Sequence, residues 1–451
     1  MKEMHIECAG AGKTYGIAQK IISMLENCPD GKKIYAITYT NYAVNQIKGE
    51  LVDSIKDIPD NIVVKTVHSY FLENIIYPYS KFIKGEPISS CSVETISGKV
   101  EWQASRIKAL KKEGVIHASI VPQYAKSILV ATKSDKVSIK KRKNIAMGYF
   151  ICDIYCLFVD EAQDMDDHFF NLLTMIVDKL ENFYFVGDPF QSLWGADRYR
   201  EFTTSYSEQD GITVVTNSVS RRIPACIVPL CNRVLPENSA LSSISTESGF
   251  VAYYLLSELD DKAMEKLASS NVFSYIKAKT EIFSTANEKA SLTNEFLQLL
   301  KEKYPLYDMS ALCYVVINRI LEIGLNAYLK QKKITLSEKN YAQLANQFRY
   351  HKETGIFVES IQKIKGLEND TAYFIICNSL LEILLGVKND FNKETNLLYV
   401  ALTRAKRRLL FIIDDDEGLR NNFQKLRIDL NTAMSELGIK KAVIEDWLGD
   451  K

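Results

Sequence analysis

The sequence lacks any uninterrupted apolar run long enough to cross a bilayer, and no cleavable signal sequence precedes its first expected strand. These absences predict a soluble, cytoplasmic protein with no membrane partner. The chain also lacks net charge, because 56 Lys and Arg residues balance 56 Asp and Glu residues. Any nucleic-acid site must therefore be a local groove, since phosphate contacts need clustered cations.

Cysteine occurs at nine positions, which is typical of free thiols in a reducing compartment. The pairs Cys152/Cys156 and Cys226/Cys231 can be drawn as a four-thiolate metal site. The first pair, however, lies in an apolar, strand-like run and the second in a helical pattern. Buried hydrophobic thiols are the favoured interpretation.

A phosphate-binding loop is the clearest feature of the N-terminal stretch. Residues 5–15 read HIECAGAGKTY, a short apolar run that breaks into glycines and continues with apolar residues at helical spacing over 16–25. In such a turn the backbone N–H groups and the helix N-terminus bind phosphates, while a Lys-Thr pair reaches the β/γ-phosphates and Mg²⁺. The match to G-x-x-x-x-G-K-[ST] is imperfect because Glu7 replaces the first glycine, and a Gly-rich turn with a chance Lys-Thr is the alternative. The expected nucleotide ligands are Gly10, Ala11, Gly12, Lys13 and Thr14.

Two further strand-helix units follow this loop. Residues 33–41 form a β-branched and aromatic run followed by a helical stretch over 42–51, and residues 62–69 repeat the scheme. This pattern predicts a parallel α/β sheet, in which functional residues lie at the carboxyl ends of the strands. The residues expected to rim one crevice are Tyr39, Thr40, Asn41, Thr66 and His68.

The pattern loosens between about residues 77 and 143, which predicts an inserted subdomain. It contains a basic cluster over 136–143 that includes KKRK at 140–143. Such a cluster near tyrosines suits single-stranded nucleic acid, and a solvated helix face explains it equally well.

Two later strands end in polar side chains that suit phosphoanhydride hydrolysis. The run 155–159 delivers Asp160, placed to hold Mg²⁺ through water, and Glu161, placed to orient and deprotonate the attacking water. The run 182–187 leads to Gln191, which can sense the γ-phosphate, and Trp194, which can stack on a base. An exposed acidic turn is the alternative for the first run.

The ordered motifs resemble those of the UvrD/Rep-like superfamily one DNA helicases over nearly the whole chain. The motifs are GAGKT, TYTN, TVHS, VDEAQD, VGDPFQSLWG, QKIKGLE and NLLYVALTRAK. The resemblance implies an α/β fold with two RecA-like P-loop domains in tandem, hydrolysis of ATP with Mg²⁺, and movement 3′ to 5′ on single-stranded DNA. A second α/β domain would place Arg404, from the last motif, opposite the P-loop as an arginine finger.

The family pattern also implies roles for individual positions. Aligned on Ile227 and Asn232, it puts the γ-phosphate arginine at Arg222, while Gly366 and Glu368 fall where the family contacts the nucleotide. The implied catalytic set is Lys13, Asp160, Glu161, Gln191, Arg222 and Arg404, with Mg²⁺ at Thr14 and Asp160. The implied DNA contacts are Tyr39, Thr40, Asn41, His68 and Trp194.

Several positions depart from that pattern. The chain has no room before its first strand for the family's adenine-reading glutamine, which puts adenine specificity in doubt. The arginine and tyrosine that sandwich adenine are exchanged here for Tyr15 and Arg221, and we expect the stack to persist with its partners swapped. Gln362 replaces a common histidine and Tyr42 a common lysine, which predicts weaker DNA grip or coupling.

The expected domains follow from these motifs and from a reduced second insertion. They are a first RecA-like domain over 1–76 and 147–215, an insertion over 77–146, a second RecA-like domain over 216–306 and 355–451, and a helical insertion over 307–354. Each insertion is a small subdomain. Such compact chains resemble the helicase-like subunit of Gabija-type anti-phage systems, whose partner is a nuclease of the OLD (TOPRIM) family.

Three functions remain open from the sequence. The first is an ATP-dependent DNA helicase or translocase in defence or repair, and the second is an ATPase that senses DNA or its ends and regulates a partner nuclease. The third is a nucleotide-binding interaction module without turnover, against which Asp160, Glu161 and Arg404 argue. No cluster of Asp, Glu and His typical of a nuclease is visible beyond the ATP site.

Overall fold

The computed structural model divides the chain into two compact units, Met1–Arg221 and Arg222–Lys451. It describes residues 1–94, 96, 100–192, 198–255, 258, 272–274, 325–326, 328–336, 341, 358–361, 365, 368–376, 378–388, 393–413, 415 and 417–442. The boundary between the units lies after the expected one at 215/216, because the strand β8 (Thr213–Asn217) belongs to the first sheet. No helix in the described part of the chain is long and apolar enough to cross a membrane.

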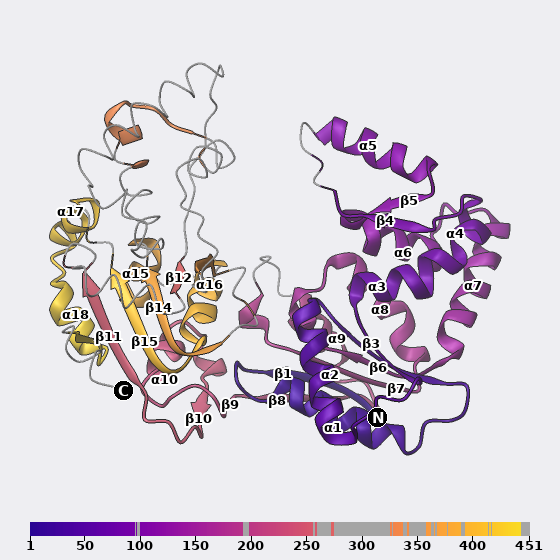
Figure 1. The fold of residues 1–451 in the computed structure, drawn as a ribbon, viewed down its shortest axis with the longest axis horizontal. Coiled ribbons are helices and arrows are strands. Elements are labelled where there is room, and N and C mark those ends of the chain that lie inside the picture. The colour runs from indigo at the N-terminus through magenta and orange to yellow at the C-terminus, as the bar shows by residue number, and fades with distance from the viewer. Residues whose placement is uncertain are drawn as a thin grey trace. The chain divides into compact units, whose positions relative to one another are not determined.

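The first unit is built on a six-stranded sheet in the order β3-β2-β6-β7-β1-β8 (Figure 1). Its other strands are β1 (Lys2–Glu7), β2 (Lys33–Thr38), β3 (Ile62–Thr66), β6 (Ile154–Val159) and β7 (Asn182–Gly187). Every pairing in this sheet is parallel, with Ile6 opposite Gly187 and Glu7 opposite Asn217. The carboxyl ends of all six strands therefore meet at one edge, as the sequence predicts.

Two helices cover one face of this sheet. The helix α1 (Lys13–Leu25) buries Ile17 and Ile21, and α2 (Asn41–Ile55) buries Ile47 and Leu51, at the spacing of an amphipathic helix. The start of α2 is fixed by Thr40, whose side chain accepts a hydrogen bond from the N–H of Ala43 at 3.1 Å. The helix thus begins directly after β2 and the two-residue link 39–40.

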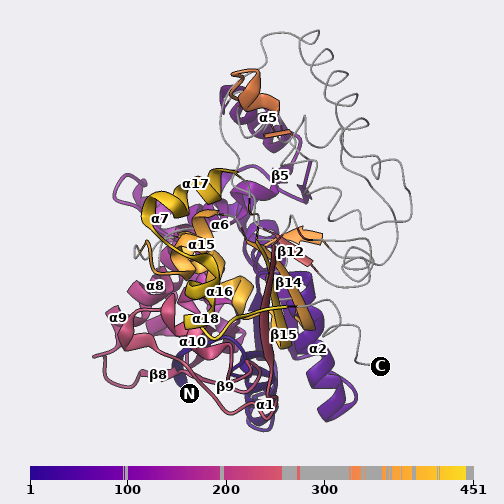
Figure 2. The ribbon, with the colours of Figure 1, turned by 90° about the vertical axis from the view of Figure 1, so that its left-hand side faces the viewer.

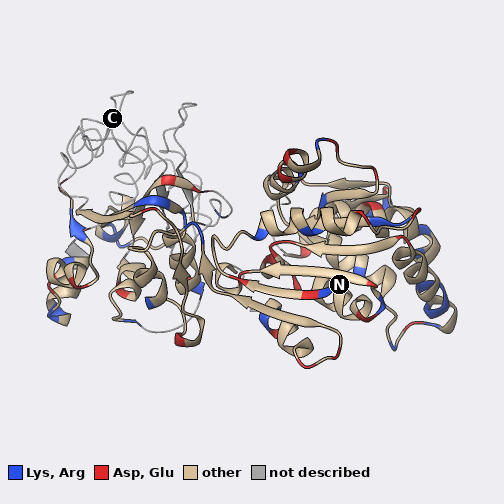
Figure 3. Ribbon diagram, turned by 90° about the horizontal axis from the view of Figure 1, so that it is seen from below, with Lys and Arg blue, Asp and Glu red and all other residues tan. Residues whose placement is uncertain are grey.

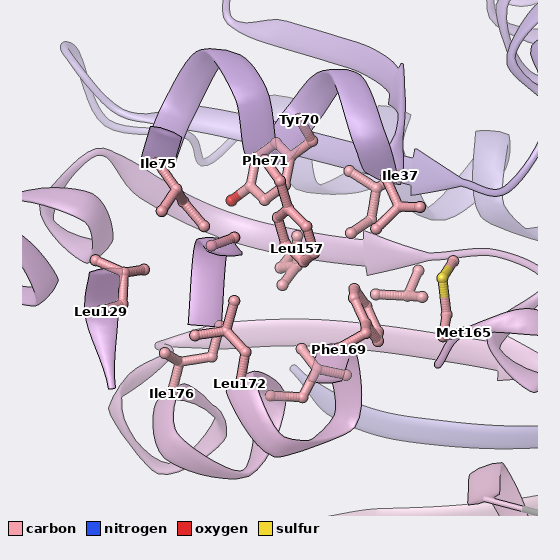
Figure 4. Packing of buried hydrophobic residues seen from close by; sticks show 14 of the residues in the cluster. Ile37, Tyr70, Phe71, Ile75, Leu129, Leu157, Met165, Phe169, Leu172 and Ile176 are labelled. Carbon is pink, nitrogen blue, oxygen red and sulfur yellow. The ribbon is translucent and has the colours of Figure 1, made fainter. Parts of the chain in front are cut away.

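The opposite face carries a larger hydrophobic cluster (Figure 4). It is covered by α3 (Val67–Phe71), the π-helical turn η1 (Leu72–Ile76), α8 (Asp167–Ile176) and α9 (Arg198–Tyr206). The rings of Phe71 and Phe169 lie 5.7 Å apart in this cluster, and both side chains are almost fully buried. Aromatic burial of this kind supplies much of a domain's stability.

The segment 77–152, which contains the insertion expected over 77–146, shares this cluster. It comprises α4 (Tyr77–Lys84), β4 (Ser90–Ser92), α5 (Val100–Lys112), β5 (Val115–His117), α6 (Val121–Leu129) and α7 (Val137–Cys152). Ile83, Tyr124 and Phe150 from the insertion belong to the same buried cluster as Tyr35 and Phe71 of the sheet layer. The insertion is therefore an extension of the first core.

The basic cluster at 136–143 is only partly a solvated face. Lys143 is 2% exposed, and its Nζ donates to the Val130 carbonyl at 2.9 Å and to the Asp135 carboxylate at 2.8 Å. These contacts hold the pKa of Asp135 down at about 2, chiefly through the Lys143 hydrogen bond. Lys143 thus has a structural role, while the neighbouring basic residues 140–142 lie nearer the surface. Figure 3 shows that basic and acidic residues both occur along the described ribbon.

The second unit also contains a six-stranded sheet, in the order β13-β12-β14-β15-β11-β16. Its strands are β11 (Phe250–Leu255), β12 (Val272–Ser274), β13 (Val358–Ser360), β14 (Asn369–Ile376), β15 (Ala405–Ile413) and β16 (Lys440–Lys441), all paired in parallel. The helices α15 (Asn378–Leu384) and α16 (Lys393–Leu402) pack together in this unit (Figure 2). Most of the helical insertion expected over 307–354 lies outside the described residues.

Candidate nucleotide and nucleic-acid site

The loop between β1 and α1 has the backbone of a phosphate-binding turn. Gly10 and Gly12 adopt φ angles of 74° and 98°, a left-handed conformation that disfavours other residues. Because Gly12 is the N-cap of α1 and has no side chain, the first-turn N–H groups of the helix are left for an anionic ligand. The Nζ of Lys13 lies over the turn and donates to the Cys8 carbonyl at 3.2 Å.

Glu7, which replaces the first glycine of the motif, is held by the strand. Its carboxylate lies 3.2 Å from Nδ1 of His5, and Nε2 of the same ring lies 2.9 Å from the carboxylate of Glu3. The His5 ring also packs against Tyr184, with centroids 4.5 Å apart. The departure from the motif is thus accommodated by neighbours on β1 and β7, and the glycines of the turn keep their conformation.

Asp160 and Glu161 lie at the carboxyl end of β6, as predicted. Asp160 is 2% exposed, and burial together with the Glu161 carboxylate raises its pKa to about 7, while the positive charge of Lys13 opposes the shift. Glu161 adopts a positive φ of 51°, a strained conformation that is concentrated at functional sites. Two adjacent carboxylates of which one is buried form a donor set that fits a hard divalent cation such as Mg²⁺.

Gln163 joins the ends of β6 and β7, a role that sequence reasoning missed. Its Nε2 donates to the Glu161 carboxylate, and its Oε1 accepts from the N–H of Asp188 at 2.8 Å. The glutamine of the VDEAQD motif could have indicated this bridge, because a side-chain amide can donate one hydrogen bond and accept another at the same time. Gln163 therefore fixes the orientation of the carboxylate that is expected to bind the attacking water.

Gln191 is anchored in the same network. It belongs to the short 3₁₀ turn η5 (Pro189–Gln191), and its Nε2 donates to the Asp188 carboxylate at 2.8 Å. Asp188, which the sequence analysis did not single out, is 1% exposed, and burial raises its pKa while Lys13 again opposes. The charge of Lys13 thus bears on buried carboxylates from two strands.

The predicted DNA-binding residues that are described lie at the carboxyl ends of β2 and β3. The rings of Tyr39 and His68 approach edge to face, with centroids 6.4 Å apart. His68 belongs to α3 and not to the strand, and burial lowers its pKa while Asp166 opposes. Asn41 begins α2 next to the capping Thr40. Trp194 lies outside the described residues.

The two residues expected to hold adenine both adjoin the P-loop. Tyr15 is 58% exposed on the first turn of α1. The N–H of Arg221 donates to the Gly10 carbonyl at 2.9 Å, which places the Arg221 backbone directly against the turn. The structure therefore brings these two positions to the same loop, with both side chains on the surface.

Residues from separate motifs of the second unit also meet within that unit. Arg222 donates to the Glu368 carboxylate and, through Nη2, to the Thr403 carbonyl at 3.1 Å, while Nζ of Lys406 lies 2.6 Å from Glu368. Burial raises the pKa of Glu368, but the charges of Arg222 and Lys406 outweigh it and hold that pKa below its usual value. Lys406 was not predicted, and Gly366 and Gln362 lie outside the described residues.

Arg404 is buried within its own unit. It is 2% exposed, with Nε donating to the Val400 carbonyl at 2.9 Å and Nη2 donating to Oγ1 of Thr403 at 3.0 Å. These hydrogen bonds hold the guanidinium at the carboxyl end of α16, where a positive charge is favourable. Its expected function as an arginine finger stays a prediction.

The first unit is therefore an α/β domain with a P-loop turn, and residues 4–196 match the model of the AAA domain family. The whole chain is 23% identical to the Gabija protein GajB of Bacillus cereus (strain VD045), over 96% of this chain and 96% of that protein. These two findings confirm the resemblance that the motifs indicate.

Among solved structures, the chain aligns with the Arterivirus nonstructural protein 10 (helicase), solved in complex with DNA, at 11% identity and a TM-score of 0.38. The alignment covers 94% of this chain but only 63% of that one.

The Gly187→Ala substitution tests the Gln163 bridge. A Cβ on Gly187 would lie 2.5 Å from Oε1 of Gln163 and 3.0 Å from Cδ1 of Tyr199, so we expect a loss of about 1–3 kcal/mol in the free energy of unfolding. Urea unfolding of the full chain measures it. The control is Gly148→Ala in α7, where a Cβ meets nothing within 4 Å and a gain of about 0.5–1 kcal/mol is expected. Equal effects of the two substitutions would contradict the bridge.

The Glu368→Gln substitution tests the ion cluster of the second unit. A carboxylate whose folded pKa is depressed stabilises the fold above its unfolded pKa, and this stability is lost as the pH falls through the folded pKa. At pH 7 we expect the variant to lose about 1–2 kcal/mol of unfolding free energy, since the Glu368 side chain is 27% exposed. Urea titrations at a series of pH values should show the difference narrowing below about pH 4.

The matched control for this titration is Glu247→Gln. Glu247 pairs with Arg407 at 2.8 Å, but its side chain is 44% exposed. We expect a change of at most about 0.5 kcal/mol at every pH, because exposed pairs contribute little. A pH-independent loss for Glu368→Gln would show that the substitution acts through packing and not through charge.

Proposed function

We propose that this protein is an ATPase of UvrD/Rep type that acts on single-stranded DNA and moves along it 3′ to 5′. The observation that carries the proposal is the convergence at one sheet edge of Lys13, the Asp160–Glu161 pair and Gln191. These residues follow the carboxyl ends of β1, β6 and β7, and β7 is hydrogen-bonded in parallel to both of the other strands, which brings the three ends side by side. Aromatic and amide side chains suited to bases lie at the ends of β2 and β3, on the same edge.

The proposed chemistry divides among the residues of this edge. The first turn of α1 and Lys13 bind the phosphates, and Glu161, oriented by Gln163, aligns a water and accepts its proton. Thr14 and Asp160 would hold Mg²⁺, which supplies positive charge that the two carboxylates and the phosphates require. Gln191 is proposed to contact the γ-phosphate. Arg222 and Arg404 are proposed to stabilise the negative charge on the γ-phosphoryl group while that group is transferred.

The proposed DNA contacts are Tyr39, Thr40, Asn41, His68 and Trp194. A ring such as Tyr39, 37% exposed beside His68, can stack on a base without sequence preference. The hydroxyl of Thr40 already caps α2. We therefore propose that Thr40 positions the start of this helix and makes no strong contact with a base. Cycles of nucleotide binding and release would then shift bases past these rings.

A second candidate function is favoured by the similarity to the Gabija protein GajB along 96% of both chains. In this alternative the protein is one subunit of an anti-phage system and its ATPase responds to DNA or to DNA ends. A nuclease subunit, of the OLD (TOPRIM) family according to the resemblance, would then do the cleavage. The two functions share the ATP site. They differ in whether ATP hydrolysis drives movement along DNA or regulates a nuclease subunit.

The first experiment is phosphate release from ATP by the full chain, with and without single-stranded DNA. We expect stimulation by DNA, and a fall of about 100-fold or more for Lys13→Ala and Glu161→Gln, because each removes a group that acts on the transition state. Lys48→Ala is the matched control, since Lys48 lies exposed on α2 and turnover should be unchanged.

The outcomes separate the candidates. Stimulation by DNA that both variants abolish supports the motor. Turnover that is absent until a nuclease subunit is added supports the second candidate. Binding of nucleotide with no phosphate release under either condition contradicts both and leaves a binding module.

The swapped adenine stack has its own test. We expect the double variant Tyr15→Ala, Arg221→Ala to raise the KM for ATP by about 10-fold, because stacking and cation–π contacts of about 1–2 kcal/mol are removed. The kcat should change little, since neither side chain touches the phosphates. A KM equal to that of the unchanged protein would overturn the stack, and Tyr42→Ala is the control for loss of an exposed tyrosine nearby.

A further inference from the structure

A second cavity lies at the amino edge of the first sheet, opposite the edge that carries the P-loop. It has a volume of about 140 Å³ and is lined at its sheet end by Tyr35, near the start of β2, and by Asp153, which precedes β6. Water occupies about 30 Å³ per molecule, so this space is large enough for an end group of several heavy atoms. The nucleotide chemistry proposed above uses none of its lining residues.

The walls of the cavity are mostly aromatic. They come from both ends of the insertion: Tyr79 from α4, and Tyr149 and Phe150 from α7, with Tyr35 and Tyr70 completing the cage. The rings of Tyr35 and Tyr70 lie edge to face with centroids 5.0 Å apart, and Tyr70 and Phe150 are 6.0 Å apart. Tyr149 is 67% exposed, so the cage has an open rim.

The lining also carries polar groups. They are the carboxylates of Asp153 and Glu73, the amide of Asn74 and the tyrosine hydroxyls, and among the described residues that line the cavity none is Lys or Arg. The Tyr35 hydroxyl donates to Oδ2 of Asp153 at 2.8 Å, which orients this carboxylate. Lys65, from outside the lining, pairs with Glu73, whereas Asp153 makes no ion pair with any residue that the structure describes.

Two independent observations mark this cavity as a built site. The Tyr70 side chain is 1% exposed, and within the described part of the chain its buried hydroxyl has no hydrogen-bond partner. Its neighbours Glu73 and Asn74 lie on η1, a π-helical turn, and such turns are rare and frequent at functional sites. An unsatisfied buried hydroxyl costs stability unless a ligand or water completes it.

We propose that this cavity, lined by Tyr35, Tyr70, Tyr79, Tyr149 and Asp153, binds an organic cation: the guanidinium or alkylammonium end of a small molecule or of a partner's side chain. Aromatic faces attract such cations through their quadrupoles, and desolvation strengthens the attraction. The carboxylate of Asp153 adds a charge-assisted hydrogen bond, which a planar guanidinium fits best. A metal ion fits poorly, because no group of three or more His, Cys, Asp or Glu side chains that could hold one is found among the described residues.

Calorimetric titration of the full chain with N-acetyl-arginine amide tests the proposal, with N-acetyl-citrulline amide as the neutral probe of the same shape. We expect saturable binding of the arginine probe and at least tenfold weaker binding of the citrulline probe. Asp153→Asn should weaken arginine binding at least tenfold while still accepting the Tyr35 hydrogen bond. Asp60→Asn, an exposed carboxylate before β3, is the matched control and should leave binding unchanged.

A second variant keeps the test decisive if Asp153→Asn disturbs the fold. Tyr149→Leu removes one exposed wall, and binding of the arginine probe should weaken several-fold. Agmatine and a peptide with a single arginine distinguish the sources: comparable affinities indicate a free small cation, and at least tenfold tighter binding of the peptide indicates a protein side chain. Any of three results would overturn the proposal. The two amide probes could bind equally well, Asp153→Asn and Tyr149→Leu could leave binding of the arginine probe unchanged, or the cavity could bind cytidine saturably in place of the cations.

Discussion

The parallel hydrogen bonding of β1 between β7 and β8 is the constraint on which the first unit depends. It places the turn after Glu7 beside Gly187 on one flank and Asn217 on the other. Because β6 and β2 continue the same parallel order, their carboxyl ends reach this edge too, and Lys13, Asp160 and Tyr39 lie along one edge of the sheet although they lie far apart in the sequence. A single antiparallel strand in this order would send one of these groups to the opposite edge.

The edge that results concentrates negative charge around one lysine. Asp160 and Asp188 are almost fully buried, Glu161 lies beside them in a strained conformation, and Lys13 is the cation whose charge reaches both aspartates. Burial of charge without a full set of partners costs stability, and hydrogen bonds from Gln163 and Gln191 offset part of that cost. The arrangement suits a site completed by an anionic ligand together with a divalent cation.

The sequence predicted the features that have a local signal. The expected bounds of two strands, 155–159 and 182–187, agree with those of β6 and β7 to within one residue. The expected helix after the P-loop agrees with α1 to within a few residues. The spacing of apolar residues and the glycines beside them specify these elements. Tertiary contacts escaped prediction: Lys143 turns inward to Asp135, the insertion joins the main core, and β8 extends the first sheet past residue 215. The pairing of His5 with Glu7 did have a signal, since residues two apart in a strand share a face.

The two edges of the first sheet are joined by the same strands. β2 has Tyr35 near its amino end and leads to Tyr39, and β6 follows Asp153 and leads to Asp160. A strand of this length spans about 20 Å, and buried strands within a sheet are stiff, so the cavity and the nucleotide edge share rigid elements without sharing any side chain. The entry and exit of the insertion, at Tyr79 and Tyr149, line that same cavity. A ligand there would therefore contact both ends of the insertion at once, and it would lie at the amino ends of β2 and β6, whose carboxyl ends carry the groups proposed to bind nucleotide and bases.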